Sequence, residues 1–231
     1  MTEPRHWAVV PAAGVGRRMG GAIPKQYLSL AGLSVIVHTL DMLLSHPRIS
    51  GVAVAISAED SWWDSIRLDT GKPLLQVNGG QERCHSVLNA LYALRELAAP
   101  EDWVLVHDAV RPCLRSIDLD ILMDTLKEDA VGGLLATPVR DTMKRADADG
   151  RVSATVDRAA LWHALTPQMF RLQVLSRALE QALKRGLLVT DDASAVEALG
   201  LAPRLVEGRA DNIKITRPED LLLAEFYLTH S

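Results

Sequence analysis

The sequence WAVVPAAGVGRRMGGAIPKQY, residues 7–27, sets the architecture of this chain. An apolar run, predicted as a strand over 8–13, leads into a glycine-containing loop that ends among cations. This arrangement is typical of phosphate binding, because glycine lets backbone N–H groups approach an anion closely. Gly14 and Gly16 fit the dinucleotide fingerprint, but Met19 stands where its third glycine belongs. The P-loop pattern fails as well, because no Gly-Lys-Ser/Thr follows.

The rest of the chain alternates apolar runs with amphipathic helical patterns. Further strands are expected at 52–57, 74–77, 103–106, 132–139 and 212–216. Helices are expected at 35–45, 62–68, 82–97, 117–127, 172–185, 192–199 and 217–228. Strands separated by helices predict an α/β fold: a Rossmann-like, mainly parallel sheet with helices on both faces.

One domain is expected over 1–231, because no linker-like segment divides the chain, with a β-arm excursion at 138–159. Short alternating segments flank an Asp-Ala-Asp-Gly turn at 147–150, which indicates a hairpin. Between Leu134 and Phe170 we expect no apolar run strong enough to enter a core. A hairpin that buries nothing is marginal alone. We therefore predict a protruding β-hairpin dimerisation arm in a homodimer, with an ordinary exposed hairpin as the alternative.

Composition narrows the class of protein. Hydrophobic residues make up 48% and charged residues 23%, as in a soluble protein with an ample core. A net charge of −4 argues against a dedicated nucleic-acid partner. The apolar run near the start is too short for a signal peptide, and no run reaches the roughly 18 residues of a membrane span. The expected location is cytoplasmic, with no membrane partner.

Polar residues gather after the predicted strands, where open parallel sheets bind ligands. In the first loop the backbone N–H groups near 12–16 precede Arg17, Arg18 and Lys25. Three cations suit a polyphosphate, whose charge rises toward the transition state and at the leaving group. The alternative is that some of these cations only face water.

Three later segments carry further candidates. NGGQERCHSV, 78–87, is a second glycine turn whose amides and Ser86 could read a base or sugar, unless it is only a tight strand–helix connection. VLVHDAVRP, 104–112, places Asp108 just past a strand, where an acid commonly holds Mg²⁺; a helix cap or salt bridge is the alternative. EGRADNIK, 207–214, supplies Lys214, which could neutralise a reacting phosphate or simply lie on the surface.

Together these motifs resemble a known enzyme family. PAAGVGRRM, PKQY, GGQERCHSV, VHDAVRP, PVRDTMKR, TVDR, LWHALTPQ, TDDASAVE and EGRADNIKITRPEDL occur in this order. The set resembles the 2-C-methyl-D-erythritol 4-phosphate cytidylyltransferases of non-mevalonate isoprenoid biosynthesis. The likeness spans about 8–228, and although single motifs are shared with other sugar-nucleotide nucleotidyltransferases, the ordered set is specific.

The resemblance implies a nucleotidyltransferase-type fold and a reaction. CMP would pass from CTP to 2-C-methyl-D-erythritol 4-phosphate, giving 4-diphosphocytidyl-2-C-methyl-D-erythritol and pyrophosphate, with Mg²⁺ or another divalent cation. The nucleophile is already a phosphate anion, so the reaction needs charge cancellation and in-line positioning rather than a general base. A ribitol-5-phosphate cytidylyltransferase and a non-catalytic nucleotide-binding protein are the alternatives.

The resemblance also implies residue roles. The catalytic residues would be Arg18, Lys25 and Lys214, around the α-phosphate. CTP would be held by Pro11, Ala12, Ala13, Gly14, Gly16, Gly80, Gln81 and Ser86. The polyol phosphate would meet Asp108, Arg111, Thr142, Arg158, Thr166 and Thr190, with Thr142 and Arg158 reaching from the arm into the neighbouring subunit. Asp108 and Asp211 would serve the metal. Gln81 and His85 depart from the family, which often has aspartate at both positions.

Overall fold

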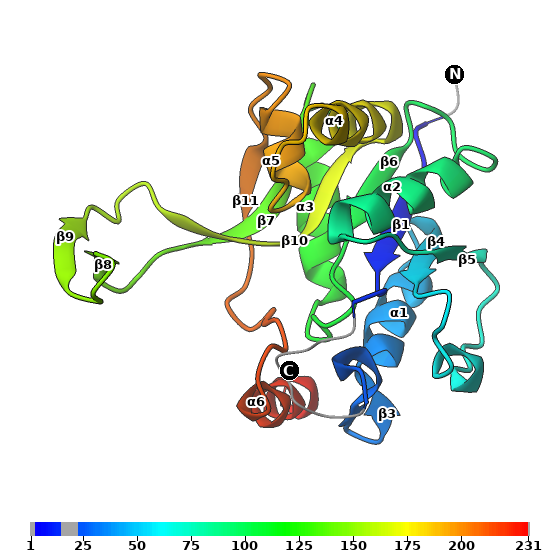
Figure 1. Ribbon diagram of the computed structural model, residues 1–231. Coiled ribbons are helices and arrows are strands. Elements are labelled where there is room, and N and C mark those ends of the chain that lie inside the picture. Colours follow the sequence, from blue (N-terminus) through cyan, green and yellow to red (C-terminus); the bar gives the residue numbers. More distant parts are fainter. Residues whose placement is uncertain (1–2, 15–22, 231) are drawn as a thin grey trace.

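A seven-stranded mixed sheet forms the centre of the computed structural model, which describes residues 3–14 and 23–230 (Figure 1). Its strand order is β11-β7-β10-β6-β1-β4-β5. The strands are β1 (His6–Pro11), β4 (Ile49–Ile56), β5 (Leu74–Asn78), β6 (Trp103–Val106), β7 (Gly132–Pro138), β10 (Trp162–Arg171) and β11 (Arg204–Glu207). Neighbours pair in parallel, except that β10 runs antiparallel to both β6 and β7.

The first apolar run forms a central strand because both of its faces are buried. In β1, Ala8 and Val10 pack in one hydrophobic cluster, whereas Trp7 and Val9 pack in another on the opposite face. Side chains of a strand alternate between the faces of a sheet, so a strand covered on both sides is apolar at every position.

Helices cover both faces of the sheet. The helices α1 (Val35–Ser45) and α3 (Ser116–Leu126) contribute to the first cluster. The second cluster takes residues from α2 (Arg83–Leu94), α4 (Leu172–Lys184) and α5 (Asp192–Glu197). These two layers confirm the predicted α/β fold with helices on both faces.

Smaller elements complete the described chain. Single turns of 3-10 helix, η2 (Lys25–Tyr27) and η3 (Trp63–Ser65), accompany a short hairpin of β2 (Ser29–Leu30) and β3 (Leu33–Ser34). The last helix, α6 (Glu219–Thr229), packs against β2 in a third cluster, and Figure 1 shows it at the bottom of the view. No helix within the described ranges has the length and apolar character needed to cross a membrane.

The expectation that no apolar run between Leu134 and Phe170 enters the core was wrong. Leu134 on β7 is buried, and Phe170 on β10 is fully buried beside β6 and β7. The pattern was obscured by polar residues, Thr166 and Gln168, that are buried too. Their side chains are hydrogen-bonded within the protein, which makes burying polar groups in a central strand acceptable.

The strand predicted at 212–216 was also wrong, and β11 at the sheet edge was missed. Ile215 is buried as predicted, but it packs in the third cluster beneath α6 rather than in the sheet. Its backbone N–H donates to the Val110 carbonyl oxygen, without a ladder of strand hydrogen bonds. The helix expected at 62–68 is only the single turn η3.

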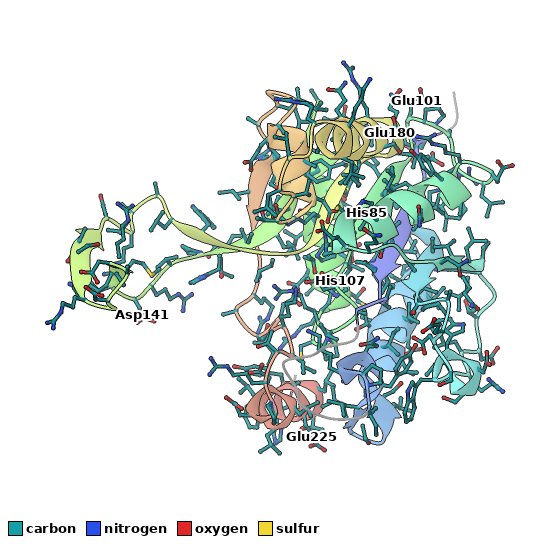
Figure 2. The ribbon with its side chains drawn as sticks, in the orientation of Figure 1. His85, Glu101, His107, Asp141, Glu180 and Glu225 are labelled. Carbon is teal, nitrogen blue, oxygen red and sulfur yellow. The ribbon has the colours of Figure 1, made fainter. Side chains whose placement is uncertain are left out.

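A hairpin extends away from the body between β7 and β10 (Figure 1). Its strands β8 (Met143–Ala146) and β9 (Val152–Val156) pair antiparallel around the 147–150 turn. Most of its side chains are exposed, and Figure 2 shows Asp141 on this arm, away from the body of the protein. Contact of the arm with a second subunit stays a prediction.

We expect the substitution Phe170→Ala to lower the free energy of unfolding by about 3–5 kcal/mol, because it leaves a cavity between sheet and helices. Chemical denaturation monitored by circular dichroism measures the change. The control is Phe226→Ala on α6, where the side chain is 55% exposed, and it should cost less than about 1 kcal/mol. Equal losses for the two variants would contradict the burial of β10.

Candidate active site

A cavity of about 450 Å³ opens at the carboxyl ends of β1, β5 and β6, where a parallel sheet places its ligands. Five stretches of the described chain line it. The lining residues are Pro11, Ala12, Ala13, Gly14, Lys25, Gln26, Gly80, Gln81, Glu82, Arg83, Ser86, Asp108, Ala109, Val110, Lys214 and Thr216.

The first glycine loop is anchored from below by a buried glutamine. Gln26 Nε2 donates hydrogen bonds to the carbonyl oxygens of Ala12 at 2.9 Å and Gly14 at 3.2 Å. Lys25 Nζ donates to the carbonyl oxygen of Ile215 at 3.3 Å. The loop after β1 is thus joined to the segment that carries Lys214, although the two lie about 190 residues apart in sequence.

The second glycine turn passes very close to the first. A Cβ atom at Gly79 would clash with the Cβ atom of Ala13, and one at Gly80 would clash with that of His85. The Gly80 N–H donates to Ser86 Oγ at 3.0 Å. Glycine is therefore required here by close approach, and the two turns form adjoining walls of the cavity.

Asp108 is shared among three cations at the floor of the cavity. Its Oδ2 atom lies 2.9 Å from Lys214 Nζ and 3.6 Å from Arg111 Nε, and its Oδ1 atom lies 3.1 Å from Arg83 Nε. Burial alone would raise the pKa of Asp108, but the charges of Arg83, Lys214 and Arg111 outweigh burial and hold that pKa well below its ordinary value. Asp108 therefore stays ionised although it is buried.

A chain of hydrogen bonds supports Asp108 from behind. The Arg111 carbonyl oxygen only accepts, so His107 Nε2 carries the proton and donates to it at 3.0 Å. His107 Nδ1 then accepts from the Thr166 hydroxyl at 3.0 Å, and Thr166 Oγ1 accepts from the Asp108 N–H at 3.1 Å. Burial lowers the pKa of His107 to about 4, so this ring, labelled within the body in Figure 2, is neutral.

Three residues that sequence reasoning missed complete this arrangement. Arg83 also places a guanidinium nitrogen 2.8 Å from Oδ2 of the fully buried Asp192. A signal for Arg83 was present, since it follows a glycine turn at a strand end. The roles of Gln26 and Asp192 depend on contacts with residues elsewhere in the sequence, so no local sequence pattern predicts them.

Within the described part of the chain, a group of three potential metal ligands lies at the start of α2. Ligand atoms of Glu82, Cys84 and His85 fall within 4.8 Å of one another. Burial, together with the charge of Glu82, raises the pKa of the Cys84 thiol. The raised pKa keeps the Cys84 thiol protonated at neutral pH when no metal is bound. Cys84 is best explained as a small packed residue of the second cluster.

The structure brings most of the predicted site residues together. The cavity is lined by Pro11, Ala12, Ala13, Gly14, Lys25, Gly80, Gln81, Ser86, Asp108 and Lys214. Arg111 and Thr166 contact Asp108 from below and are themselves buried. Gly16, Arg17 and Arg18 lie outside the described residues.

Four predicted residues lie elsewhere. Asp211 pairs with Arg115 at 2.6 Å and Arg209 at 2.8 Å and lines a separate cavity, so it does not share a metal site with Asp108. Thr142 and Arg158 are exposed at the two ends of the arm. Thr190 is exposed before α5, where its N–H donates to Ser194 Oγ.

Comparison with protein families gives a match over residues 6–230. The matching family model is described as IspD: 2-C-methyl-D-erythritol 4-phosphate cytidylyltransferase. The enzyme of that name from Pseudomonas putida strain W619 is 58% identical over 221 residues, which cover 95% of this chain and 94% of that protein. The one from Pseudomonas aeruginosa PAO1 is 55% identical over 228 residues, covering 98% of this chain and 97% of that protein.

Solved structures agree with these relatives. A crystal structure titled 4-diphosphocytidyl-2C-methyl-D-erythritol synthase superposes with a TM-score of 0.85 at 39% identity, covering 97% of this chain and 99% of that chain. The Francisella tularensis 2-C-methyl-D-erythritol 4-phosphate cytidylyltransferase gives a TM-score of 0.84 at 35% identity, covering 96% of this chain and 99% of that chain.

We expect the variant Asp108→Asn to lower the free energy of unfolding at pH 7 by about 3 kcal/mol, because it removes the anion that pairs with the buried Arg111 and the partly buried Arg83. The folded pKa of Asp108 lies below its unfolded value, so its stabilisation is present above about pH 4 and is lost as the pH falls through the folded pKa. The difference between parent and variant should therefore shrink below about pH 4. Denaturant titrations from pH 3 to pH 7 measure it.

The control for this variant is Asp124→Asn. Asp124 pairs with Arg48 at 2.9 Å, but its side chain is 67% exposed. Exposed pairs contribute less than about 1 kcal/mol, so this variant should stay close to the parent. A loss for Asp108→Asn that is the same from pH 3 to pH 7 would contradict the low pKa.

Proposed function

The chain belongs to the 2-C-methyl-D-erythritol 4-phosphate cytidylyltransferase family, and from that membership we propose that it transfers CMP from CTP to 2-C-methyl-D-erythritol 4-phosphate. The products are 4-diphosphocytidyl-2-C-methyl-D-erythritol and pyrophosphate. The observation that carries this proposal is the cavity between two glycine turns, where Lys25 and Lys214 come together beside the ionised Asp108.

The reaction is an in-line displacement at phosphorus. An oxygen of the acceptor phosphate forms a bond to the α-phosphorus of CTP, and the bond from that phosphorus to the oxygen bridging to the β-phosphorus breaks. The electron pair leaves with pyrophosphate. The nucleophile is already an anion, so the protein has to supply cations and alignment rather than a base.

Lys25, Lys214 and Arg18 are the proposed source of that positive charge. An ammonium group acts as a point charge, whereas the planar guanidinium of Arg18 suits two oxygens of one phosphate. Lys214 Nζ lies 2.9 Å from Asp108 Oδ2. An arriving triphosphate offers Lys214 a second anion, so we propose that Lys214 is shared between Asp108 and the reacting phosphate.

The two glycine turns are proposed to hold CTP. The loop after β1 is assigned to the phosphates through Pro11, Ala12, Ala13, Gly14 and Gly16, and the first four of these line the cavity. Gly80, Gln81 and Ser86 suit the ribose and base. The Gln81 amide both donates and accepts hydrogen bonds, unlike the aspartate that often stands there in the family, so its contact with cytidine differs in kind.

Asp108 is the proposed carboxylate for Mg²⁺, or another divalent cation. Mg²⁺ is usually bound through one or two carboxylates together with substrate phosphates and water, so an ionised Asp108 beside a triphosphate site fits it. When bound, the metal supplies positive charge to the triphosphate and the leaving pyrophosphate. Asp211, held by two arginines at a separate cavity, has no part in this proposal.

The acceptor pocket is proposed to include residues from two subunits. Asp108 lines the cavity, Arg111 and Thr166 contact Asp108 from below, and Thr190 is a weaker candidate. Thr142 and Arg158 lie on the arm, outside their own cavity. We therefore propose that the protein is a homodimer in which each arm completes the partner's pocket.

An assay matrix tests the proposed function directly. CTP, UTP and ATP are each combined with 2-C-methyl-D-erythritol 4-phosphate or ribitol 5-phosphate, and pyrophosphate release is measured with Mg²⁺. The proposal expects turnover with CTP and the methylerythritol acceptor. Turnover with ribitol 5-phosphate alone would assign the other cytidylyltransferase activity, and no turnover with any pair would favour a nucleotide-binding protein.

Removing one of the lysines should abolish most turnover. We expect Lys25→Ala and Lys214→Ala each to lower kcat by about 10²–10³, because a preorganised charge near the reacting phosphate is lost. Steady-state kinetics measure this, with circular dichroism to verify folding. The control, Lys184→Ala at the exposed end of α4, removes an equal charge far from the cavity and should keep parental kinetics.

The arm's role in the partner's site should appear as complementation. In a mixture of Lys25→Ala and Arg158→Ala protomers, a mixed dimer keeps one site with both groups intact. Random exchange should then restore about a quarter of parental activity, because half the dimers are mixed and each has one active site. No recovery after verified subunit exchange, or a fully active monomer by sedimentation, would contradict the arrangement.

A further inference from the structure

We infer that Arg83 and Asp192 form a positioning pair that fixes the Asp108 carboxylate beside Lys214. Arg83 is the first residue of α2 and Asp192 the first residue of α5, so the pair joins two helices, with Arg83 lining the cavity and Asp192 buried behind it. The inference rests on the proposed function, in which Lys214 serves the reacting phosphate. It adds a role for two residues that do not themselves contact the reacting atoms.

The guanidinium of Arg83 is suited to hold two carboxylates in fixed places. Its Nε atom lies 3.1 Å from Asp108 Oδ1, and a terminal nitrogen lies 2.8 Å from Asp192 Oδ2. These nitrogens belong to one rigid plane, so the position of Asp192 sets the plane, and the plane sets Asp108 Oδ1. The other oxygen of Asp108 then faces Lys214 at 2.9 Å.

Arg83 is the cation that pairs with Asp192. It is fully buried, and among the described residues its Oδ1 atom has no hydrogen-bond partner. Burial raises the pKa of Asp192, and the neighbouring Arg83 opposes that rise. A buried carboxylate with one cationic partner pulls strongly on that partner, which holds Arg83 back from the triphosphate.

The pair is not needed merely to attach α5 to the sheet. Gln168 on β10 already does this, because its Oε1 accepts from the Ala193 N–H at 2.7 Å and its Nε2 donates to Asp191 Oδ2 at 2.8 Å. Asp191 also caps α5 by accepting from the Ser194 N–H. With α5 fixed independently, Asp192 is a stationary anchor from which Arg83 can orient Asp108.

Steady-state kinetics on three variants test the inference. Arg83→Lys keeps a cation but cannot span both carboxylates, and the double variant Arg83→Gln/Asp192→Asn removes both charges without leaving either buried alone. We expect kcat to fall about tenfold to hundredfold in both, since a small misplacement near the reacting groups has that effect, with the KM for CTP within about threefold of the parent. Asp192→Asn weakens the interaction between Arg83 and residue 192, so its kcat should lie between that of the parent and that of the double variant.

Arg95→Gln is the matched control. Arg95 follows the other end of α2 and pairs with Glu180 of α4 at 2.9 Å, so it also joins α2 to a neighbouring helix. Figure 2 shows Glu180 on α4, well separated from His107 beneath the site. This variant should keep both kcat and KM.

Other kinetic outcomes would overturn the inference. A raised KM with unchanged kcat would make Arg83 a substrate-binding residue. A parental kcat in Arg83→Lys would show that Arg83 contributes only its positive charge and does not position Asp108. If the folded variants lose thermal stability but keep the parental kcat, the Arg83–Asp192 pair serves only the stability of the fold.

A crystal structure of Arg83→Gln/Asp192→Asn tests the geometry without any assay. We expect the Asp108 carboxylate to leave its parental orientation, while the Gln168–Ala193 hydrogen bond persists. An unchanged Asp108 would overturn the inference whether or not the parent is active. A reoriented Asp108 in a protein whose parent shows no cytidylyl transfer would instead sink the proposed function alone.

Discussion

The ionised carboxylate of Asp108 is the interaction on which the rest of the site depends. It lies at 7% exposure between Arg83, Arg111 and Lys214, which come from three separate segments. Placing one buried anion among three cations holds those segments together, because removing it would leave the buried Arg111 and the partly buried Arg83 without this anion. The same arrangement leaves surplus positive charge at the cavity floor. This surplus positive charge favours a ligand that carries several phosphate groups.

Much of the fold was predictable from local pattern, because the sheet is buried on both faces. Short local patterns were enough to predict these elements. Continuous apolar runs predicted β1 and β6, and apolar residues at helical spacing predicted α2 and α4. The prediction failed where burial does not follow hydrophobicity. In β10 the buried Thr166 and Gln168 break the apolar pattern. At 212–216 the alternating pattern reflects packing under α6 rather than strand hydrogen bonds.

In the candidate site, too, some residues were predictable from local sequence and others were not. Glycine turns, Lys25, Asp108 and Lys214 were predictable because strand ends in a parallel sheet converge on one edge. Gln26 and Asp192 were not, because each acts through a contact whose partner is fixed only by folding: a loop carbonyl for Gln26, and a guanidinium 109 residues away for Asp192. The family resemblance implied a metal role for Asp211, yet Asp211 pairs with two arginines and lines a different cavity.

Strand β10 limits how the length of the arm can vary. It emerges from the arm, passes Thr166 beneath the cavity and continues to Met169 and Phe170 in the core. Because strand side chains alternate, one inserted residue in β10 would reverse which face each of these side chains meets. The exposed 147–150 turn at the arm's tip has no such constraint, so we expect insertions and deletions that change the length of the arm to be accommodated there rather than in β10.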